Sequence, residues 1–354
     1  MTGEERGSWE KRISEEERDF TDEYSDIISD WLDSSVDSIE AQTSGSTGTP
    51  KSILLPKHLV RQSAWRTIRY FGIDRSWILG ACISAKYIGG KMMAVRSLEI
   101  GCKFVSEPPS NRPQLRLIRE SQRKVLMSVV PSQMWHILNL RLSEAEKKRI
   151  HFLIGGSAIP QVLRDAIADN GLQAWESYGM TETCSHIALR KVSKEMIPFS
   201  PLPGIEVESS EKDTLIIRNA GDGEIMTNDL VEIDSNGNFQ ILGRLDNVII
   251  SGGLKVIPEQ TEAKIKSILA SSTWADGISE LMIASQPDEK WGQVPVLLLE
   301  IPKQEELFSA TADEILLFLS KYKPDFLLPQ EFPRKIIISE SIPRTPGGKL
   351  KRKI

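Results

Sequence analysis

Residues 42–51 read Gln-Thr-Ser-Gly-Ser-Thr-Gly-Thr-Pro-Lys, a run too rich in glycine and hydroxyl groups to form a regular helix or strand. The spacing approaches that of a nucleotide P-loop, but Pro50 stands where that loop needs its second glycine, and proline has no N–H group. Gly45 and Gly48 still allow backbone N–H groups to face an anion, and Lys51 adds a positive charge. Further hydroxyl donors are Thr43, Ser44, Ser46, Thr47 and Thr49. We therefore expect a phosphate-binding loop here, with a flexible surface loop as the alternative.

The segments that follow this loop alternate between short apolar runs and runs with helical spacing. We expect strands at residues 78–84, 103–106, 125–130 and 151–154. We expect helices at residues 59–70, 90–98, 113–123, 132–140 and 160–170. Strands that alternate with helices predict an α/β fold with a parallel sheet.

Two further sequence patterns follow along the chain. Between about residues 200 and 243, prolines and glycines separate short strands, which predicts an antiparallel, hairpin-rich region. After Arg244 we expect strands at 248–251, 280–284, 294–301 and 335–339, with helices at 259–270 and 311–322. A length of 354 residues suggests about two domains. We therefore expect a large α/β domain over residues 1–243 and a small, mobile α+β domain over residues 244–354.

The first forty residues form an acidic extension. Apolar residues recur at helical spacing from Phe20 to Leu32, which predicts an amphipathic helix over residues 14–33. We expect its apolar side to dock on the main body and its acidic side to face water.

Composition excludes several classes of protein. Apolar residues make up 40% of the chain and charged residues 26%, which is enough apolar material for a large core. The net charge of −5 argues against general nucleic-acid binding, and no apolar run approaches the length of a membrane span. The three cysteines and four histidines are scattered, which argues against a disulfide framework or a zinc site. We expect a cytoplasmic protein.

A second motif, Glu176-Ser-Tyr-Gly-Met-Thr-Glu-Thr183, combines groups suited to a nucleotide. Glu182 supplies a hard carboxylate that suits Mg²⁺, and Thr181 supplies a hydroxyl for a phosphate. Tyr178 offers an aromatic face for a base, and Gly179 permits a close backbone approach. Taken alone, this stretch is equally consistent with an ordinary turn.

The phosphate loop and this second motif resemble those of the adenylate-forming enzymes, the superfamily of acyl-CoA synthetases, adenylation domains and luciferases. Two more stretches match that family in the expected order, residues 244–259 (Arg-Leu-Asp-Asn-Val-Ile-Ile-Ser-Gly-Gly-Leu-Lys-Val-Ile-Pro-Glu) and 343–352 (Pro-Arg-Thr-Pro-Gly-Gly-Lys-Leu-Lys-Arg). The resemblance covers about residues 41–354. Members are usually longer, with a further sheet upstream of the phosphate loop, and we expect this chain to be a smaller, active enzyme.

The resemblance implies roles for individual residues. Lys349 is the implied catalytic lysine, acting with Thr181 and Glu182, and a positioned ammonium would stabilise charge that develops at the α-phosphate. The implied ribose-binding residues are Asp229 and Arg244. Asp246 is the implied pivot of the small domain. The segment implied to move toward the active site for the CoA step contains Gly252, Gly253 and Lys255, and the implied adenine-flanking residues are Gly155, Gly156 and Ser157.

The acid substrate is suggested by a departure from the family pattern. Lys86 and Lys91, with Arg96 nearby, lie where many members have an aromatic–histidine pair. Because an unpaired buried ammonium is costly, these cations suggest a substrate with a second carboxylate, although lysines on an exposed helix face are the alternative. Several segments are also similar to the short o-succinylbenzoate–CoA ligases of menaquinone synthesis, which places Ser185 and His186 near the substrate.

These observations lead to one main hypothesis and two alternatives. The main hypothesis is an AMP-forming ligase that uses ATP, Mg²⁺ and coenzyme A to convert o-succinylbenzoate to its CoA thioester. The first alternative is a ligase for another acid or for a carrier-protein acceptor. The second is a nucleotide-binding homologue without catalysis. The oligomeric state stays open.

Overall fold

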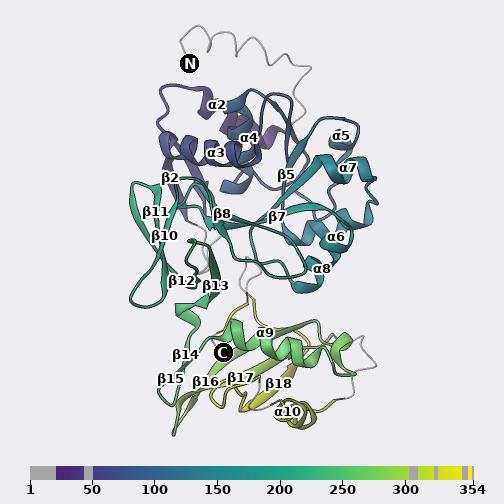
Figure 1. The fold of residues 1–354 in the computed structure, drawn as a ribbon, viewed down its shortest axis with the longest axis vertical. Coiled ribbons are helices and arrows are strands. Elements are labelled where there is room, and N and C mark those ends of the chain that lie inside the picture. Colours follow the sequence, from purple (N-terminus) through teal and green to yellow (C-terminus); the bar gives the residue numbers. More distant parts are fainter. Residues whose placement is uncertain (1–20, 44–50, 303–309, 323–325, 345–349, 353–354) are drawn as a thin grey trace.

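The computed structural model describes residues 21–43, 51–302, 310–322, 326–344 and 350–352. Its largest feature is a seven-stranded sheet in the order β4-β3-β5-β6-β7-β8-β9 (Figure 1). The first five of these strands are parallel, while β8 and β9 are antiparallel to their neighbours. The strands are β3 (Ile78–Ala81), β4 (Lys103–Ser106), β5 (Val125–Val129), β6 (Ile150–Ile154), β7 (Gln173–Met180), β8 (Ser185–Lys191) and β9 (Ser200–Pro201).

Helices cover both faces of this sheet. Within β5, Val125 and Met127 pack on one core cluster and Leu126 on the other, as the alternation of side chains along a strand requires. The parallel α/β fold expected from the sequence is therefore confirmed. One face carries α3 (Lys57–Phe71) and α4 (Ile88–Ile100), and the other carries α5 (Arg116–Arg119), α6 (Pro131–Asn139), α7 (Glu144–Arg149) and α8 (Gln161–Asp169).

Helix α5 is much shorter than the helix expected at residues 113–123. The backbone of Leu115 is left-handed, with φ of 55°, so a continuous right-handed helix cannot pass through it. The carboxylate of Glu107 accepts hydrogen bonds from Gln114 N and Arg116 N instead, which holds the chain in a turn before the helix begins.

The first residues that the structure describes, from Thr21 to Leu32, pack on the same face as α3 and α4. Of the helix expected over 14–33, residues 14–20 lie outside the described residues, and the rest forms the short turn Asp22–Tyr24 and α2 (Ser25–Leu32). Tyr24 is fully buried and its hydroxyl donates to Ile83 O at 2.6 Å. Trp31 is also buried, and its indole N–H donates to Glu99 on α4 at 3.2 Å. The apolar side of this segment therefore docks on the main body, as expected.

A two-stranded hairpin carries the two ends of the glycine-hydroxyl loop. β1 (Ser38–Gln42) pairs antiparallel with β2 (Ser52–Pro56). Thr43 N donates to Lys51 O at 2.8 Å and Lys51 N donates to Thr43 Oγ1 at 3.1 Å, so the two residues that flank the loop are held together.

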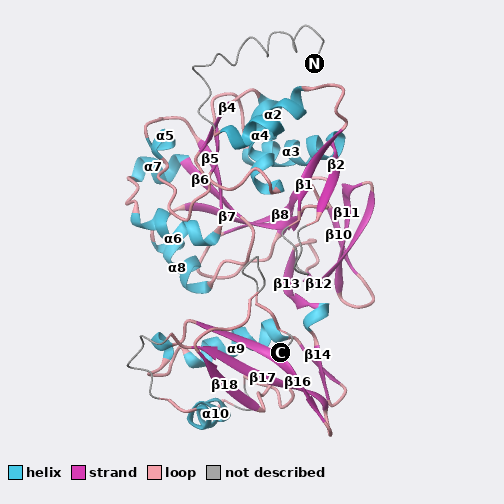
Figure 2. Ribbon diagram, turned by 180° about the vertical axis from the view of Figure 1, so that it is seen from behind, coloured by secondary structure: helices cyan, strands magenta, loops and turns pink. Residues whose placement is uncertain are grey.

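Two more sheets follow along the chain (Figures 1 and 2). The first is antiparallel, as expected, and contains β10 (Glu206–Ser209), β11 (Thr214–Gly221), β12 (Gly223–Ile233) and β13 (Phe239–Arg244). The second follows the turn Leu245–Asn247 and contains β14 (Ile249–Ser251), β15 (Leu254–Val256), β16 (Glu280–Asp288), β17 (Gly292–Glu300) and β18 (Lys335–Ser339). Its helices are α9 (Pro258–Leu269) and α10 (Ala312–Ser320), with a short turn at Ala275–Gly277. In the part of the chain that the structure describes, every helix is too short or too polar to cross a membrane.

Candidate nucleotide and acid site

Residues from three separate parts of the sequence meet at one hydrogen-bonded cluster at the carboxyl end of β7. Tyr178 on β7 donates its hydroxyl to Asp229 Oδ2 at 2.6 Å, and Arg244 Nη1 donates to Asp229 Oδ1 at 3.0 Å. Asp229 and Arg244 are directly opposite one another on β12 and β13. Burial, and next the negative charge of Asp229, raise the pKa of Tyr178, so its hydroxyl keeps its proton. The cluster presents an aromatic ring beside a carboxylate and a guanidinium.

The end of β7 and the start of β8 form a tight reversal. A Cβ atom on Gly179 would lie 2.3 Å from Ser185 O and 2.5 Å from His186 Cα, so the close approach that glycine permits here is to the neighbouring strand. Cys184 and Ser185 have φ of 54° and 104°, an uncommon backbone for residues with side chains. The turn therefore holds Thr181 buried and Glu182 exposed.

The carboxylate of Glu182 fits a magnesium ion that arrives with a nucleotide. Glu182 is exposed, and its carboxylate has no hydrogen-bond or ion-pair partner among the described residues. Mg²⁺ is usually held by one or two carboxylates together with substrate phosphates and water rather than by a complete protein cage. The described residues contain no cluster of three or more metal-ligating side chains.

Gly155, Gly156 and Ser157 lie on the loop after β6, directly beside the end of β7. Gly156 has φ of 91°, and Ser157 is exposed. Glu176 fixes this loop, because its Oε1 accepts a hydrogen bond from Ile159 N at 3.1 Å. The carboxyl ends of parallel strands are the usual ligand side of an open α/β sheet, and this loop occupies that side.

Glu176 is itself held by two arginines in the interior. Its Oε2 accepts from Arg164 on α8 at 2.5 Å and from Arg190 on β8 at 2.8 Å, and all three side chains are buried. The guanidinium of Arg190 also lies 4.1 Å from the ring centre of Phe199. The sequence motif contained Glu176, but its role depends on arginines distant in sequence and was not predicted.

A second cluster lies behind the β7–β8 turn, where the sequence predicted the acid. Arg96 on α4 is 1% exposed, and its Nη2 lies 3.4 Å from Ser185 Oγ. Ser185 Oγ also lies 3.4 Å from His186 Nδ1, and His186 Nε2 lies 3.0 Å from Thr67 Oγ1. Burial, and next the positive charge of Arg96, hold the pKa of His186 well below its usual range. The cluster therefore combines a neutral imidazole with a buried guanidinium.

Arg96 has no carboxylate partner among the described residues. Its Nε makes no hydrogen bond, and its Nη1 contacts Met93 Sδ at 3.4 Å. Burial lowers its pKa to about 9, so the guanidinium is still charged at neutral pH. A buried cation with free donors is costly unless an anion joins it.

Of the two lysines predicted to bind the acid, neither is as buried as Arg96. Lys86 is exposed in the turn before α4, and Lys91 is half-buried on α4, where burial lowers its pKa. From the sequence, Arg96 was predicted only as a neighbour of these lysines, because the pattern of a charged residue in an apolar helix does not show whether that residue is buried.

The remaining predicted residues lie around the turn that follows β13. Asp246 accepts hydrogen bonds from Asn228 and from Arg244, so it joins the Tyr178–Asp229 cluster. Gly252 and Gly253 form the tip of the β14–β15 hairpin, with φ of 58° and 81°. Lys255 lies 3.7 Å from Asp213 on the β10–β11 turn, away from that cluster. Ser44, Gly45, Ser46, Thr47, Gly48, Thr49 and Lys349 lie outside the described residues.

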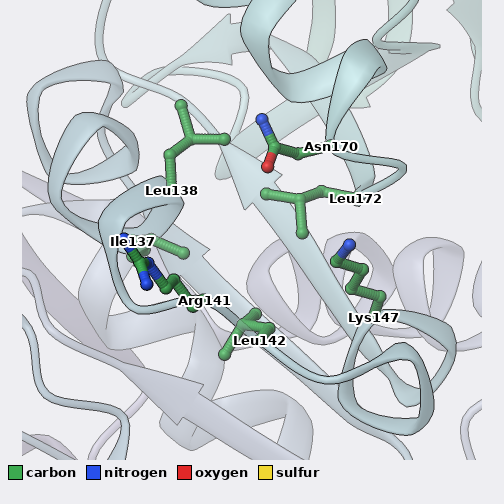
Figure 3. A pocket seen from close by; sticks show the side chains of 7 residues that line it. All are labelled: Ile137, Leu138, Arg141, Leu142, Lys147, Asn170 and Leu172. Carbon is green, nitrogen blue, oxygen red and sulfur yellow. The ribbon is translucent and has the colours of Figure 1, made fainter.

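A separate pocket opens between α6 and the end of α8 (Figure 3). Its volume is about 180 Å³, and Leu138, Leu142 and Leu172 line it together with Arg141 and Lys147. None of the predicted site residues lines this pocket, so it is distinct from the two clusters.

Comparison with known proteins gives one match to a family model and several related proteins. A model described as AMP-binding enzyme matches residues 42–228, more than half of the chain. A 2-succinylbenzoate–CoA ligase of Bacillus anthracis is 27% identical, with the match covering 88% of this chain and 68% of that protein. The ligase of the same name from Listeria monocytogenes is 26% identical with the same coverage.

Solved structures show a similar fold. An acyl-CoA synthetase (AMP-forming)/AMP-acid ligase II-like protein from Dyadobacter fermentans is 29% identical, with a TM-score of 0.59 over 93% of this chain and 91% of that one. The o-succinylbenzoate coenzyme A synthetase of Bacillus subtilis, solved with ATP and a magnesium ion, has a TM-score of 0.72 at 24% identity. That match covers 88% of this chain and 68% of the Bacillus chain.

Proposed function

Since the chain belongs to the family of AMP-binding enzymes, we propose that it is an ATP-dependent acid–CoA ligase that acts through an acyl-adenylate. The observation that carries this proposal is the cluster of Tyr178, Asp229 and Arg244, which joins three separate parts of the sequence by two hydrogen bonds. The relatives named 2-succinylbenzoate–CoA ligase support the same reaction class.

We assign the nucleotide to the carboxyl side of β6 and β7. Asp229 would accept hydrogen bonds from the ribose hydroxyls, and Tyr178 and the Gly155–Ser157 loop would flank the base. Thr43 and Lys51, at the ends of the glycine-hydroxyl loop, and Thr181 would contact the phosphates. Bound Mg²⁺ would neutralise phosphate charge beside Glu182.

The proposed acid is o-succinylbenzoate, whose second carboxylate is bound but not activated. Support comes from the buried, unpaired guanidinium of Arg96, beside Ser185 and His186. An aromatic carboxylate would give this cation the anion that the described residues lack, through charge-assisted hydrogen bonds. Lys86 and Lys91 remain further candidates for the same carboxylate.

The proposed reaction has two steps. The acid's free carboxylate attacks the α-phosphate of ATP and displaces pyrophosphate, with Lys349 stabilising the charge that develops. The part of the chain after Arg244 would then turn about Asp246, withdraw Lys349 and bring Gly252, Gly253 and Lys255 toward the site for CoA. The CoA thiol attacks the acyl carbonyl, AMP leaves, and the thioester forms. A rotation is required because the same active site must first place Lys349 for adenylation and then admit the CoA thiol.

The experiment that tests the proposal measures pyrophosphate and AMP release with ATP, Mg²⁺ and CoA. o-Succinylbenzoate is compared with benzoate, succinate and a medium-chain fatty acid. Turnover with o-succinylbenzoate alone is the expected result. Turnover with another acid would keep the reaction class and reject the substrate. If every acid fails, a carrier-protein acceptor is tested next, and binding of AMP without pyrophosphate exchange would favour a non-catalytic homologue.

A further inference from the structure

The residues on either side of positions 345–349 are held close together. Lys351 N donates to Pro343 O at 2.8 Å, and Arg344 forms a single antiparallel bridge with Leu350. The described residues on either side of positions 345–349 are therefore joined to each other.

The C-terminal end of this base is fixed to α9 by a largely buried ion pair. Arg352 donates through Nη1 and Nη2 to the two carboxylate oxygens of Glu262, with an Nη2–Oε2 distance of 2.9 Å. The side chains are 15% and 14% exposed. Arg352 Nη1 also donates to Ile283 O at 3.2 Å, while Ile283 N donates to Glu262 Oε1 at 2.6 Å. The carboxylate of Glu262 thus connects α9, β16 and Arg352, and its contact with the guanidinium is bidentate.

The same arginine lies close to a second carboxylate that reaches the turn after β13. Arg352 Nε is 3.5 Å from Glu259 Oε1, and the same oxygen accepts a hydrogen bond from Asn247 at 2.6 Å. Asn247 directly follows Asp246, the predicted pivot. The polar contacts therefore run without a break from the turn, through the first part of α9, to Arg352.

We propose that Arg352, through Glu262, is a positioning residue for Lys349 in the adenylation step. It fixes residues 350–352, which directly follow Lys349 in the sequence, to α9, so that these residues and α9 move together when the chain turns about Asp246. Arg352 acts through its neighbours and does not touch the nucleotide. The inference rests on the proposed function, because it assigns Lys349 to adenylation.

The test compares Arg352→Gln and Glu262→Gln with Lys351→Gln, a matched control that removes a charge from an exposed neighbour. Each half-reaction is measured separately, as acid-dependent ATP–pyrophosphate exchange and as thioester formation from supplied acyl-adenylate. We expect Arg352→Gln and Glu262→Gln to lower exchange by up to about 10²-fold, the scale for a misplaced catalytic group, and to spare the thioester step. Lys351→Gln should resemble the wild type.

A double variant then tests whether the two residues act as a pair. Because the contact is lost in either single variant, Arg352→Gln combined with Glu262→Gln should lower exchange little more than the worse single change. Equal loss of both half-reactions in the single variants would indicate general damage to the fold and would overturn the positioning role.

Hydrogen–deuterium exchange supplies a readout that does not need activity. Arg352→Gln should speed exchange in peptides that cover residues 341–344 and 350–352, and Lys351→Gln should not. Unchanged exchange in Arg352→Gln would overturn the anchor. A wild-type chain that adenylates no acid would count against the proposed function, while the exchange data would still decide whether Arg352 holds this segment.

Discussion

Arg96 lies in an apolar interior with a serine hydroxyl and a thioether as its neighbours, which is an unfavourable place for a charge without a counter-ion. His186 stays neutral beside it, because burial and the guanidinium both oppose its protonation. These side chains are arranged as a binding site for an anion would be, with the positive charge supplied in advance. Retaining an unpaired buried cation costs stability, which is typical of functional sites.

The change Arg96→Met tests this assignment, because it removes the charge and keeps a long apolar side chain. We expect KM for o-succinylbenzoate to rise about 10- to 100-fold, the scale of hydrogen bonds to a charged group, with little change in KM for ATP. The comparison is Lys86→Met, which alters an exposed lysine. If Lys86→Met raises KM for the acid and Arg96→Met does not, the carboxylate site belongs to Lys86 instead.

At the scale of elements, the β7–β8 reversal links the cluster of Tyr178, Asp229 and Arg244 to the cluster of Arg96, Ser185 and His186. β7 contributes Tyr178 to the first cluster, and β8 contributes Ser185 and His186 to the second. At Gly179 a Cβ atom would meet the backbone of the neighbouring strand rather than a side chain that can move away. The relative placement of the two clusters therefore depends on the absence of a side chain at Gly179.

Gly179→Ala should destabilise the protein by roughly 1–3 kcal/mol or more, the usual cost of overpacking, and should also impair turnover. Urea unfolding at constant m gives the change in stability. Gly89→Ala is the matched control. Its added methyl group would meet the end of the Ile83 side chain at 3.2 Å, and alanine favours the α4 helix. Equal unfolding midpoints for wild type and Gly179→Ala would contradict the steric argument.

Most elements could be predicted from the sequence, because their apolar periodicity is strong. The strands expected at 103–106 and 335–339 have the same bounds in the structure. β7 and β1 were not predicted as strands, because their sequences are rich in polar and hydroxyl residues. Their strand conformation depends instead on pairing with neighbouring strands. The Glu176 and Arg96 environments were missed for a related reason, since each depends on residues far apart in sequence that only the fold brings together.

At the scale of the whole molecule, the apolar core has separate parts. One cluster spans the seven-stranded and antiparallel sheets, and includes Leu79, Ile217 and Phe239. The buried residues of the clusters beneath β16 and β17 all come from position 249 onward. A boundary at residues 243–244 stays a prediction, which this division of the core supports.

Two histidines, His186 (buried) and His151 (half-buried), make the stability of the whole protein depend on pH. The pKa values of His186 and His151 are lowered in the folded state, mainly by burial, so the unfolded chain binds protons more readily. The contribution of these two histidines to the free energy of unfolding is therefore complete above about pH 6.5, and it falls as the pH drops below that value. Each such histidine contributes a slope of at most about 1.4 kcal/mol per pH unit.

We expect the free energy of unfolding to fall between pH 6.5 and 5.5, and to fall less steeply in His186→Asn. Urea unfolding at several pH values measures both slopes. The exposed His58 is the control position, because His58→Asn removes a histidine that is not buried. Parallel slopes for the wild type and His186→Asn would show that this imidazole is not the proton acceptor.

The packing of α2 has a practical consequence for anyone who shortens this protein. Glu99 on α4 accepts hydrogen bonds from Trp31, Trp65 and Arg61, so one carboxylate fastens α2 and α3 to α4. Lys57 in turn donates to the backbone oxygen of Asp33, just after α2. A shorter version that begins at residue 34 would lack the buried side chains of Tyr24 and Trp31. Trp31 contacts α4, which is the helix that carries Arg96. A cloning boundary that keeps the chain from Thr21 onward would retain these contacts.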